Sequence, residues 1–204
     1  MKNIIFDFGN VIVTFNEKDL VSHFTDNKEE QDFIVEKVIG SPEWNTYGLI
    51  DSGFITNEEA SILINDRTNN IHKELVDTFM KDYYKYMYIQ KEVLDIIQRL
   101  KEKGYKIYLL SNTNEFMYDK FIKEIEYLFD GMVLSYRTHT IKPHDSIYKY
   151  LLDKYNLNPE ESLFIDDRED NMYTANKFGI KGRNIKPADI DDIKEVLKEY
   201  GIGD

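Results

Sequence analysis

Polar side chains that could do chemistry stand directly after three apolar stretches and at one predicted helix start. They are Asp7 after Ile4–Phe6, Ser111 and Asn112 after Ile107–Leu110, Asp166 with Asp167 after Leu163–Ile165, and Lys142 before Pro143. Three carboxylates suit Mg²⁺, which binds one or two protein carboxylates together with water and a phosphate oxygen. A hydroxyl, backbone amides and a lysine can hold the other phosphate oxygens. A carboxylate so placed can also attack phosphorus and form an aspartyl-phosphate.

Each of these residues also has a purely structural interpretation. Asp7 alone is typical of a turn or a helix cap, and Ser111 is typical of an N-cap. Asp166 and Asp167 could cap the helix that follows, although two adjacent carboxylates repel each other there without a cation. The order of all four groups along one chain favours the chemical interpretation.

The elements around these residues predict an α/β fold. Apolar strands are expected over 3–6, 106–110, 131–134, 162–165 and 180–185, and from about residue 89 they alternate with helical segments. Such alternation predicts parallel strands with right-handed crossovers, in a doubly wound parallel sheet. The carboxyl ends of such strands meet at one edge, where ligands bind, so we expect the polar residues to converge there.

The segment between the first and second strands is predicted to be helical. Phe79, Met80, Tyr83, Tyr84 and Met87 have helical spacing, and Thr56–Glu59 forms a capping box at a helix start. We interpret residues 16–88 as an inserted α-helical cap domain over the carboxyl ends of the strands. Residues 1–15 and 89–204 then form the α/β core domain.

Composition excludes several classes of protein. The chain has 204 residues, 26 Lys and Arg against 38 Asp and Glu, and a net charge of −12, so we expect no nucleic-acid partner. It has no cysteine, which excludes disulfides and thiolate metal sites. The first apolar stretch is too short for a signal peptide and no segment is long enough to span a membrane, so we expect a soluble, cytoplasmic protein.

Taken together, these motifs resemble the haloacid dehalogenase (HAD) superfamily, in the subgroup with a helical cap after the first motif. Asp7–Val11, Leu110–Asn114, Lys142–Pro143 and Phe164–Asp167 match its four motifs in order, and the match covers nearly the whole chain. Within the superfamily, the sequences of these motifs are most similar to those of bacterial α-glucose-1-phosphate phosphatases. The resemblance implies a Rossmann-like core, Mg²⁺ and a small phosphorylated metabolite as substrate.

The resemblance also implies a role for each residue. Asp7 would be the nucleophile and a magnesium ligand, and Lys142 would neutralise the phosphate and the nucleophile. Ser111 and Asn112 would bind the phosphoryl group. Gly9 through its carbonyl, Asp167 directly and Asp166 through water would hold the metal.

One position departs from the family pattern. Most family phosphatases carry a second Asp two residues after the nucleophile, as general acid and later base, and here that residue is Gly9. A general acid contributes about 10²–10⁴-fold to a rate. Three explanations are open. The enzyme could be less active, or its leaving group could need less protonation, as an anomeric sugar oxygen does. A cap residue or a water molecule could also relay the proton.

Three functions remain open from the sequence. The first is a Mg²⁺-dependent phosphatase acting through an aspartyl-phosphate, with a sugar phosphate favoured as substrate. The alternatives are a metal-independent haloacid dehalogenase and a non-catalytic phospho-ligand-binding protein. Glu43, Trp44 and Tyr47 fall in the part of the cap that faces substrate in similar proteins, although Trp44 and Tyr47 could equally be cap core. We expect a monomer or weak homodimer.

Overall fold

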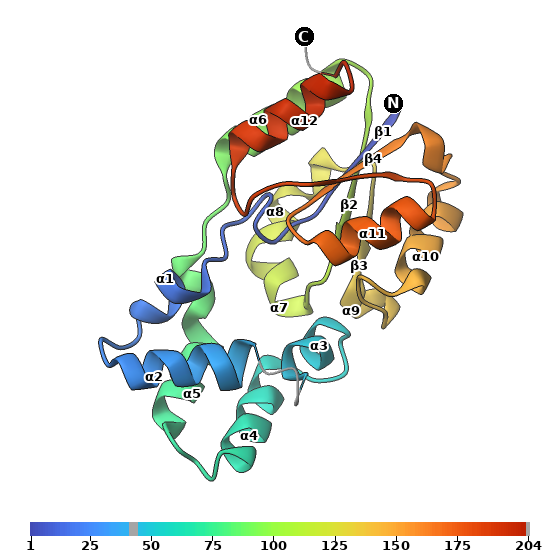
Figure 1. The fold of residues 1–204 in the computed structure, drawn as a ribbon. Coiled ribbons are helices and arrows are strands. Elements are labelled where there is room, and N and C mark those ends of the chain that lie inside the picture. Colours follow the sequence, from blue (N-terminus) through green and yellow to red (C-terminus); the bar gives the residue numbers. More distant parts are fainter. Residues whose placement is uncertain (41–44, 203–204) are drawn as a thin grey trace.

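The computed structural model describes residues 1–40 and 45–202, and its centre is a five-stranded sheet. All strand pairings are parallel, and the strand order is β3-β2-β1-β4-β5 (Figure 1). The strands are β1 (Asn3–Phe6), β2 (Lys106–Ser111), β3 (Gly131–Leu134), β4 (Ser162–Asp166) and β5 (Lys181–Asn184). The predicted doubly wound α/β sheet is therefore confirmed.

The central strands are apolar because both faces of the sheet are covered. Ile4 and Phe6 of β1 pack into one cluster, which includes residues of α6 and α12, whereas Ile5 packs into a second cluster with α10 and α11. Alternate residues of a strand point to opposite faces, so a strand buried on both sides reads as a continuous apolar run. The helices of the core are α6 (Lys91–Glu102), α7 (Glu115–Met117), α8 (Lys123–Ile125), α9 (Ser135–Thr138), α10 (Asp145–Tyr155), α11 (Glu169–Lys177) and α12 (Ile190–Glu199), with short η3 (Tyr118–Ile122), η4 (Glu126–Leu128) and η5 (Pro159–Glu161) turns.

A helical cap is inserted between β1 and β2. It contains α1 (Glu17–Ser22), α2 (Lys28–Phe33), η1 (Ile34–Ile39), α3 (Thr46–Asp51), α4 (Asn57–Arg67), α5 (Lys73–Asp82) and η2 (Tyr83–Tyr86). The predicted capping box starts α4, where Thr56 Oγ1 accepts the Glu59 N–H and the Glu59 carboxylate accepts the Thr56 N–H. Figure 1 shows the cap beyond the carboxyl ends of the strands, with α3 close to α9 of the core.

Two helical segments depart from a regular α-helix. The segment from 115 to 126 is not one helix but a succession of short α, π and 3₁₀ turns, α7, η3, α8 and η4. The helical spacing of Phe79–Met87 does not continue as one α-helix, because α5 ends at Asp82 and the next turn, η2, is 3₁₀. Several apolar side chains of each segment are still buried, among them Met117, Ile122 and Ile125 in the first and Phe79, Met80 and Met87 in the second. A tighter or wider turn also keeps residues three to five apart on one side. Over the described ranges, no helix is both long and apolar enough to cross a membrane.

Candidate active site

The sheet register brings Asp7 and Asp166 to the same level of neighbouring strands. Phe6 of β1 pairs with Ile165 of β4, and the Asp7 N–H donates to the Ile165 carbonyl at 3.0 Å. Asp7 is thus the first residue beyond β1, and Asp166 is the last residue of β4. The predicted convergence at the carboxyl edge follows directly from this parallel pairing.

Lys142 joins the two carboxylates. Its Nζ lies 2.7 Å from Asp7 Oδ1 and 2.7 Å from Asp166 Oδ2, and its side chain is almost completely buried. Burial by itself lowers the pKa of a lysine, but the charges of Asp166 and Asp7 outweigh it and raise the pKa of Lys142 above its ordinary value. Lys142 therefore stays a cation, held against the carboxylate predicted to be the nucleophile.

Asn112 fixes the backbone at Lys142. Its Oδ1 accepts the Lys142 N–H at 2.7 Å, and its Nδ2 donates to the Lys142 carbonyl at 2.9 Å. The side-chain amide that we expected to bind phosphate is thus engaged in positioning the lysine. Ser111, fully buried at the end of β2, makes a long hydrogen bond of 3.4 Å from its Oγ to the Asn112 carbonyl. Phosphate binding by Ser111 and Asn112 stays a prediction.

Asp7, Asp166 and Asp167 form a compact carboxylate cluster. One oxygen from each lies within 4.8 Å of the others. Asp166 is held by Asn171, whose Nδ2 lies 2.9 Å from both of its oxygens, and by the Arg168 N–H at 2.8 Å. The remaining carboxylate, Asp167, accepts one hydrogen bond on Oδ2 from Asn10 Nδ2 at 3.1 Å.

The charges of this cluster fit a divalent cation. The three carboxylates face one ammonium, Lys142, so in their ionised forms two negative charges remain uncompensated. Burial raises the pKa of Asp7 to about 8; Lys142 opposes this shift, and the charges of Asp166 and Asp167 add to it. Burial also raises the pKa of Asp167. Hard oxygen donors with excess negative charge are the set that Mg²⁺ prefers.

The backbone around Gly9 lies beside this cluster and is open. A Cβ built on Gly9 would meet no atom within 4 Å, so the absence of a side chain is not imposed by crowding. The next residue, Asn10, has a positive φ of 54°, and its carbonyl accepts the Ala188 N–H at 2.6 Å. Metal binding by the Gly9 carbonyl remains a prediction.

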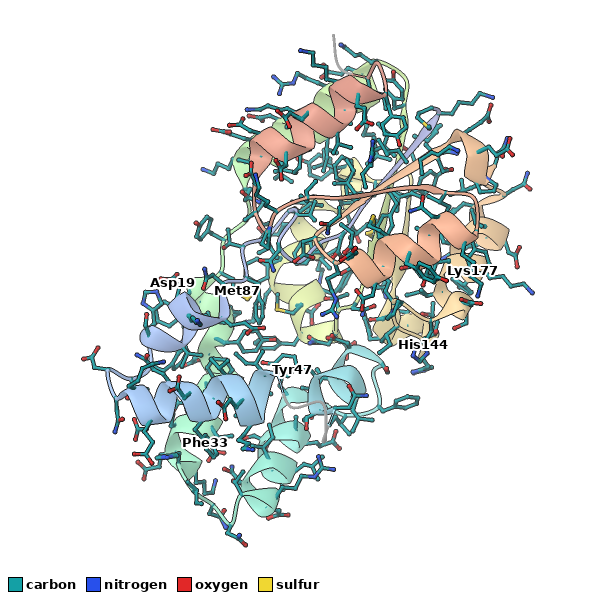
Figure 2. All side chains as sticks on the ribbon, viewed as in Figure 1. Asp19, Phe33, Tyr47, Met87, His144 and Lys177 are labelled. Carbon is teal, nitrogen blue, oxygen red and sulfur yellow. The ribbon has the colours of Figure 1, made fainter. Side chains whose placement is uncertain are left out.

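On the cap, the predicted substrate-facing residues have different outcomes. Glu43 and Trp44 lie outside the described residues. Tyr47, on α3, lies on the side of the cap turned toward the core (Figure 2). Its hydroxyl is buried and has no hydrogen-bond partner among the described residues, and burial raises the pKa of Tyr47 well above its ordinary value. A buried hydroxyl without a partner is costly, which is a reason to expect a ligand there.

Sequence reasoning missed three residues that organise the site. Asn10 holds Asp167, Asn171 holds Asp166, and Asp51, the last residue of α3, faces the core from the cap. Asn10 lies within the first predicted motif and Asn171 follows the fourth by four residues, and a side-chain amide is a natural donor to a carboxylate. Asp51 gave no comparable signal, because its partners are more than sixty residues away in the sequence.

Comparisons with known proteins agree with this geometry. The sequence model of the haloacid dehalogenase-like hydrolases matches residues 1–179. A curated relative, the D-ribitol-5-phosphate phosphatase of Bacteroides thetaiotaomicron, is 26% identical over 192 residues, covering 89% of this chain and 90% of the relative.

Two solved structures share the fold over nearly their whole length. A wild-type HAD family enzyme from Bacteroides thetaiotaomicron, in complex with magnesium and inorganic phosphate, superposes with a TM-score of 0.71 and 25% identity, covering 93% of this chain and 96% of the other. A protein from Porphyromonas gingivalis, described as a predicted HAD-like family hydrolase, has a TM-score of 0.76 at 24% identity, covering 97% of this chain and 98% of the other.

Proposed function

Because the chain belongs to the haloacid dehalogenase-like hydrolase family, we propose that it is a Mg²⁺-dependent phosphatase of small phosphorylated metabolites. The observation that carries the proposal is the buried ammonium of Lys142, 2.7 Å from both Asp7 and Asp166, within a cluster of three carboxylates. A site that combines a cation-binding cluster with a fixed ammonium group has the positive charge needed to bind a dianionic phosphate ester.

In the proposed reaction, Asp7 attacks phosphorus and forms an aspartyl-phosphate, which water then hydrolyses. Lys142 neutralises Asp7 and the transferring phosphoryl group, and Ser111 with the backbone at Asn112 binds phosphoryl oxygens. Asp7, the Gly9 carbonyl, Asp167 and, through water, Asp166 would hold Mg²⁺, which supplies charge neutralisation and orientation of the phosphate.

The substrate we favour is a phosphorylated sugar or sugar alcohol. The relative described above acts, by its name, on D-ribitol 5-phosphate. The motif sequences of this chain resemble those of α-glucose-1-phosphate phosphatases. Both substrates pair a phosphate with a polyhydroxylated body. The unpartnered hydroxyl of Tyr47, on the core-facing side of the cap, supports a hydrogen-bonding rather than an apolar substrate.

We also propose the boundaries of the cap as residues 16–88. The two connecting segments run side by side where the cap joins the core: the Thr14 N–H donates to the Tyr88 carbonyl at 3.0 Å, and the Gln90 N–H donates to the Ile12 carbonyl at 2.9 Å. Such a paired crossing supports a joint at which the cap leaves and re-enters the core.

The test is phosphate release from a panel of phosphorylated sugars, sugar alcohols and other metabolites, with Mg²⁺ and with EDTA. We expect activity that requires Mg²⁺ and is lost in the Asp7→Asn variant. Absence of Asp7-dependent phosphate release across the panel, or halide release from haloacids that is indifferent to EDTA, would overturn the proposal.

A further inference from the structure

Each carboxylate at the edge of the sheet already has a role in the proposed reaction other than proton transfer. Asp7 is the nucleophile, Asp166 accepts hydrogen bonds from Lys142, Asn171 and the Arg168 N–H, and Asp167 is a metal ligand held by Asn10. Yet an alkoxide leaving group needs a proton, and the attacking water must lose one. Gly9, two residues after the nucleophile, has no side chain to supply either.

The geometry of phosphoryl transfer says where a proton donor must be. Attacking and leaving oxygens lie roughly in line on opposite sides of phosphorus. Because Asp7 approaches from the core, the leaving oxygen points toward the cap, which lies beyond the carboxyl ends of the strands (Figure 1). The donor is therefore expected on the cap.

Asp51 is held at that place by contacts between the cap and the core. Ser135 Oγ donates to the Asp51 carbonyl at 2.5 Å and also accepts the N–H of Thr113, in the loop after β2, at 2.8 Å. The carbonyl of the next residue, Ser52, lies 2.8 Å from His139 Nδ1 of the core.

The chain just after Asp51 lies tightly against the core. Gly53 has a φ of 70°, and a Cβ there would lie only 2.7 Å from the Tyr136 carbonyl oxygen. The backbone at Asp51 is thus fixed against the loops that carry the site.

The groups that influence the Asp51 carboxyl group belong to the site. The Asp51 side chain is half-buried, and both Asn114 of the second motif and the charge of Lys142 act to lower its pKa. The other titratable groups that face it are the hydroxyls of Tyr47 and Tyr83. Burial raises the pKa of Asp51 to about 7, against the opposing effects of Asn114 and Lys142, so both of its protonation states are populated near neutral pH.

We propose that Asp51 is the general acid and base of this enzyme, taking the role that Gly9 cannot perform. This inference rests on the proposed phosphatase activity. In the first step, an Asp7 oxygen bonds to phosphorus while the bond from phosphorus to the ester oxygen breaks, and the Asp51 proton passes to that oxygen to give an alcohol. In the second, the Asp51 carboxylate takes a proton from water, whose oxygen bonds to phosphorus as the bond to Asp7 breaks and phosphate leaves.

The experiment compares Asp51→Asn with wild type on two kinds of ester. For a sugar phosphate that wild type hydrolyses, we expect kcat to fall by about 10²–10⁴-fold. For p-nitrophenyl phosphate, whose leaving group needs no proton, we expect the first step to remain fast and the second to slow. The variant should then release a burst of one equivalent of p-nitrophenolate before a slow steady state. Asp66→Asn, an exposed carboxylate on α4 of the same cap, is the matched control and should behave as wild type.

A rescue variant separates proton transfer from a structural role. A Cβ at Gly9 would meet no atom within 4 Å, so the backbone there leaves room for the first atom of a side chain, and Gly9→Asp introduces a carboxyl group two residues after the nucleophile. We expect the double variant Gly9→Asp/Asp51→Asn to recover sugar phosphate turnover at least tenfold over Asp51→Asn. A merely structural defect at Asp51 would not be repaired from the core.

The pH profile gives an independent readout. The leaving group is protonated only by the neutral acid, so wild-type kcat/KM for a sugar phosphate should decline above about pH 7, and this limb should be absent in Asp51→Asn. Full activity of Asp51→Asn on sugar phosphates, or an equal loss on both esters without a burst, would overturn the inference while leaving the phosphatase intact. A wild type without Asp7-dependent activity would instead overturn the proposed function.

Discussion

The edge of the sheet and the facing surface of the cap both bury polar groups, but they satisfy them differently. At the sheet edge, Lys142 contacts two carboxylates, and Asp166 accepts bonds from Asn171 and a backbone amide. On the cap, the Tyr47 hydroxyl and the Thr46 Oγ1 are buried without a hydrogen-bond partner among the described residues.

This difference separates the chemistry from the recognition of substrate. A network whose members hold one another is rigid, and it presents the same phosphate-binding geometry to any ester. Buried polar groups without a partner are stabilised only when a ligand supplies that partner. The core is therefore expected to set the reaction, and the cap to set which metabolite undergoes it.

The largest effect should come from the centre of the rigid region. In Lys142→Met, two buried carboxylates lose their shared cation, and breaking such a buried pair costs about 3–5 kcal/mol in the free energy of unfolding. We expect this loss in chemical denaturation without Mg²⁺ at pH 7, together with a fall in phosphatase activity of at least about 10²-fold. A variant that is as stable and active as wild type would show that the network is not cooperative.

Mg²⁺ should change the stability of the same region in a pH-dependent way. The pKa of Asp7 is raised to about 8 in the folded protein. Between about pH 8 and pH 4, and without metal, Asp7 is therefore protonated in the folded state but ionised in the unfolded state. This difference stabilises the folded state more and more as the pH falls through that range. Metal binding needs the ionised carboxylate, so the stabilisation by Mg²⁺ should grow as the pH rises.

Thermal unfolding with and without Mg²⁺ at pH 6 and pH 8 measures this effect. At a hundredfold excess over its dissociation constant, Mg²⁺ should add about 2.7 kcal/mol. Asp167→Asn, which keeps the Lys142 network but lacks a proposed metal ligand, should lose most of the increase. An equal increase in that variant would place the metal elsewhere.

The smallest effect should come from the cap. Tyr47→Phe removes a buried hydroxyl that has no partner among the described residues, so the stability of the free protein should not decrease. If substrate supplies the missing partner, KM should rise about tenfold, which corresponds to one hydrogen bond, while kcat stays within about twofold. Tyr150→Phe, an exposed position on α10, serves as the control. A loss confined to kcat would assign Tyr47 to the chemistry instead.

How much the sequence could predict follows the same division. The strands, their parallel arrangement and the convergence of Asp7, Lys142 and Asp166 were predictable, because apolar runs ending in polar residues indicate both the sheet and its edge. The role of Asn112 in holding the Lys142 backbone was not, since an amide that binds backbone and one that binds phosphate look alike in a sequence.

The cap was harder to predict, because its contribution depends on tertiary contacts. Asp51 is placed near the site by the docking of α3 on Ser135, and no local pattern marks it among 38 acidic residues. The 3₁₀ turn that follows α5 could not be predicted for a different reason, because the spacing of Phe79 to Met87 fits an α-helix equally well.

The most direct test of the account is to trap the phosphorylated enzyme. Wild type is mixed with a labelled phosphate ester and Mg²⁺, quenched in acid during turnover, and digested for peptide mapping. We predict an acid-stable, hydroxylamine-labile phosphate on the peptide that contains Asp7, absent from Asp7→Asn. Phosphate attached to a peptide without Asp7, or its persistence in Asp7→Asn, would contradict the assignment of Asp7 as the nucleophile.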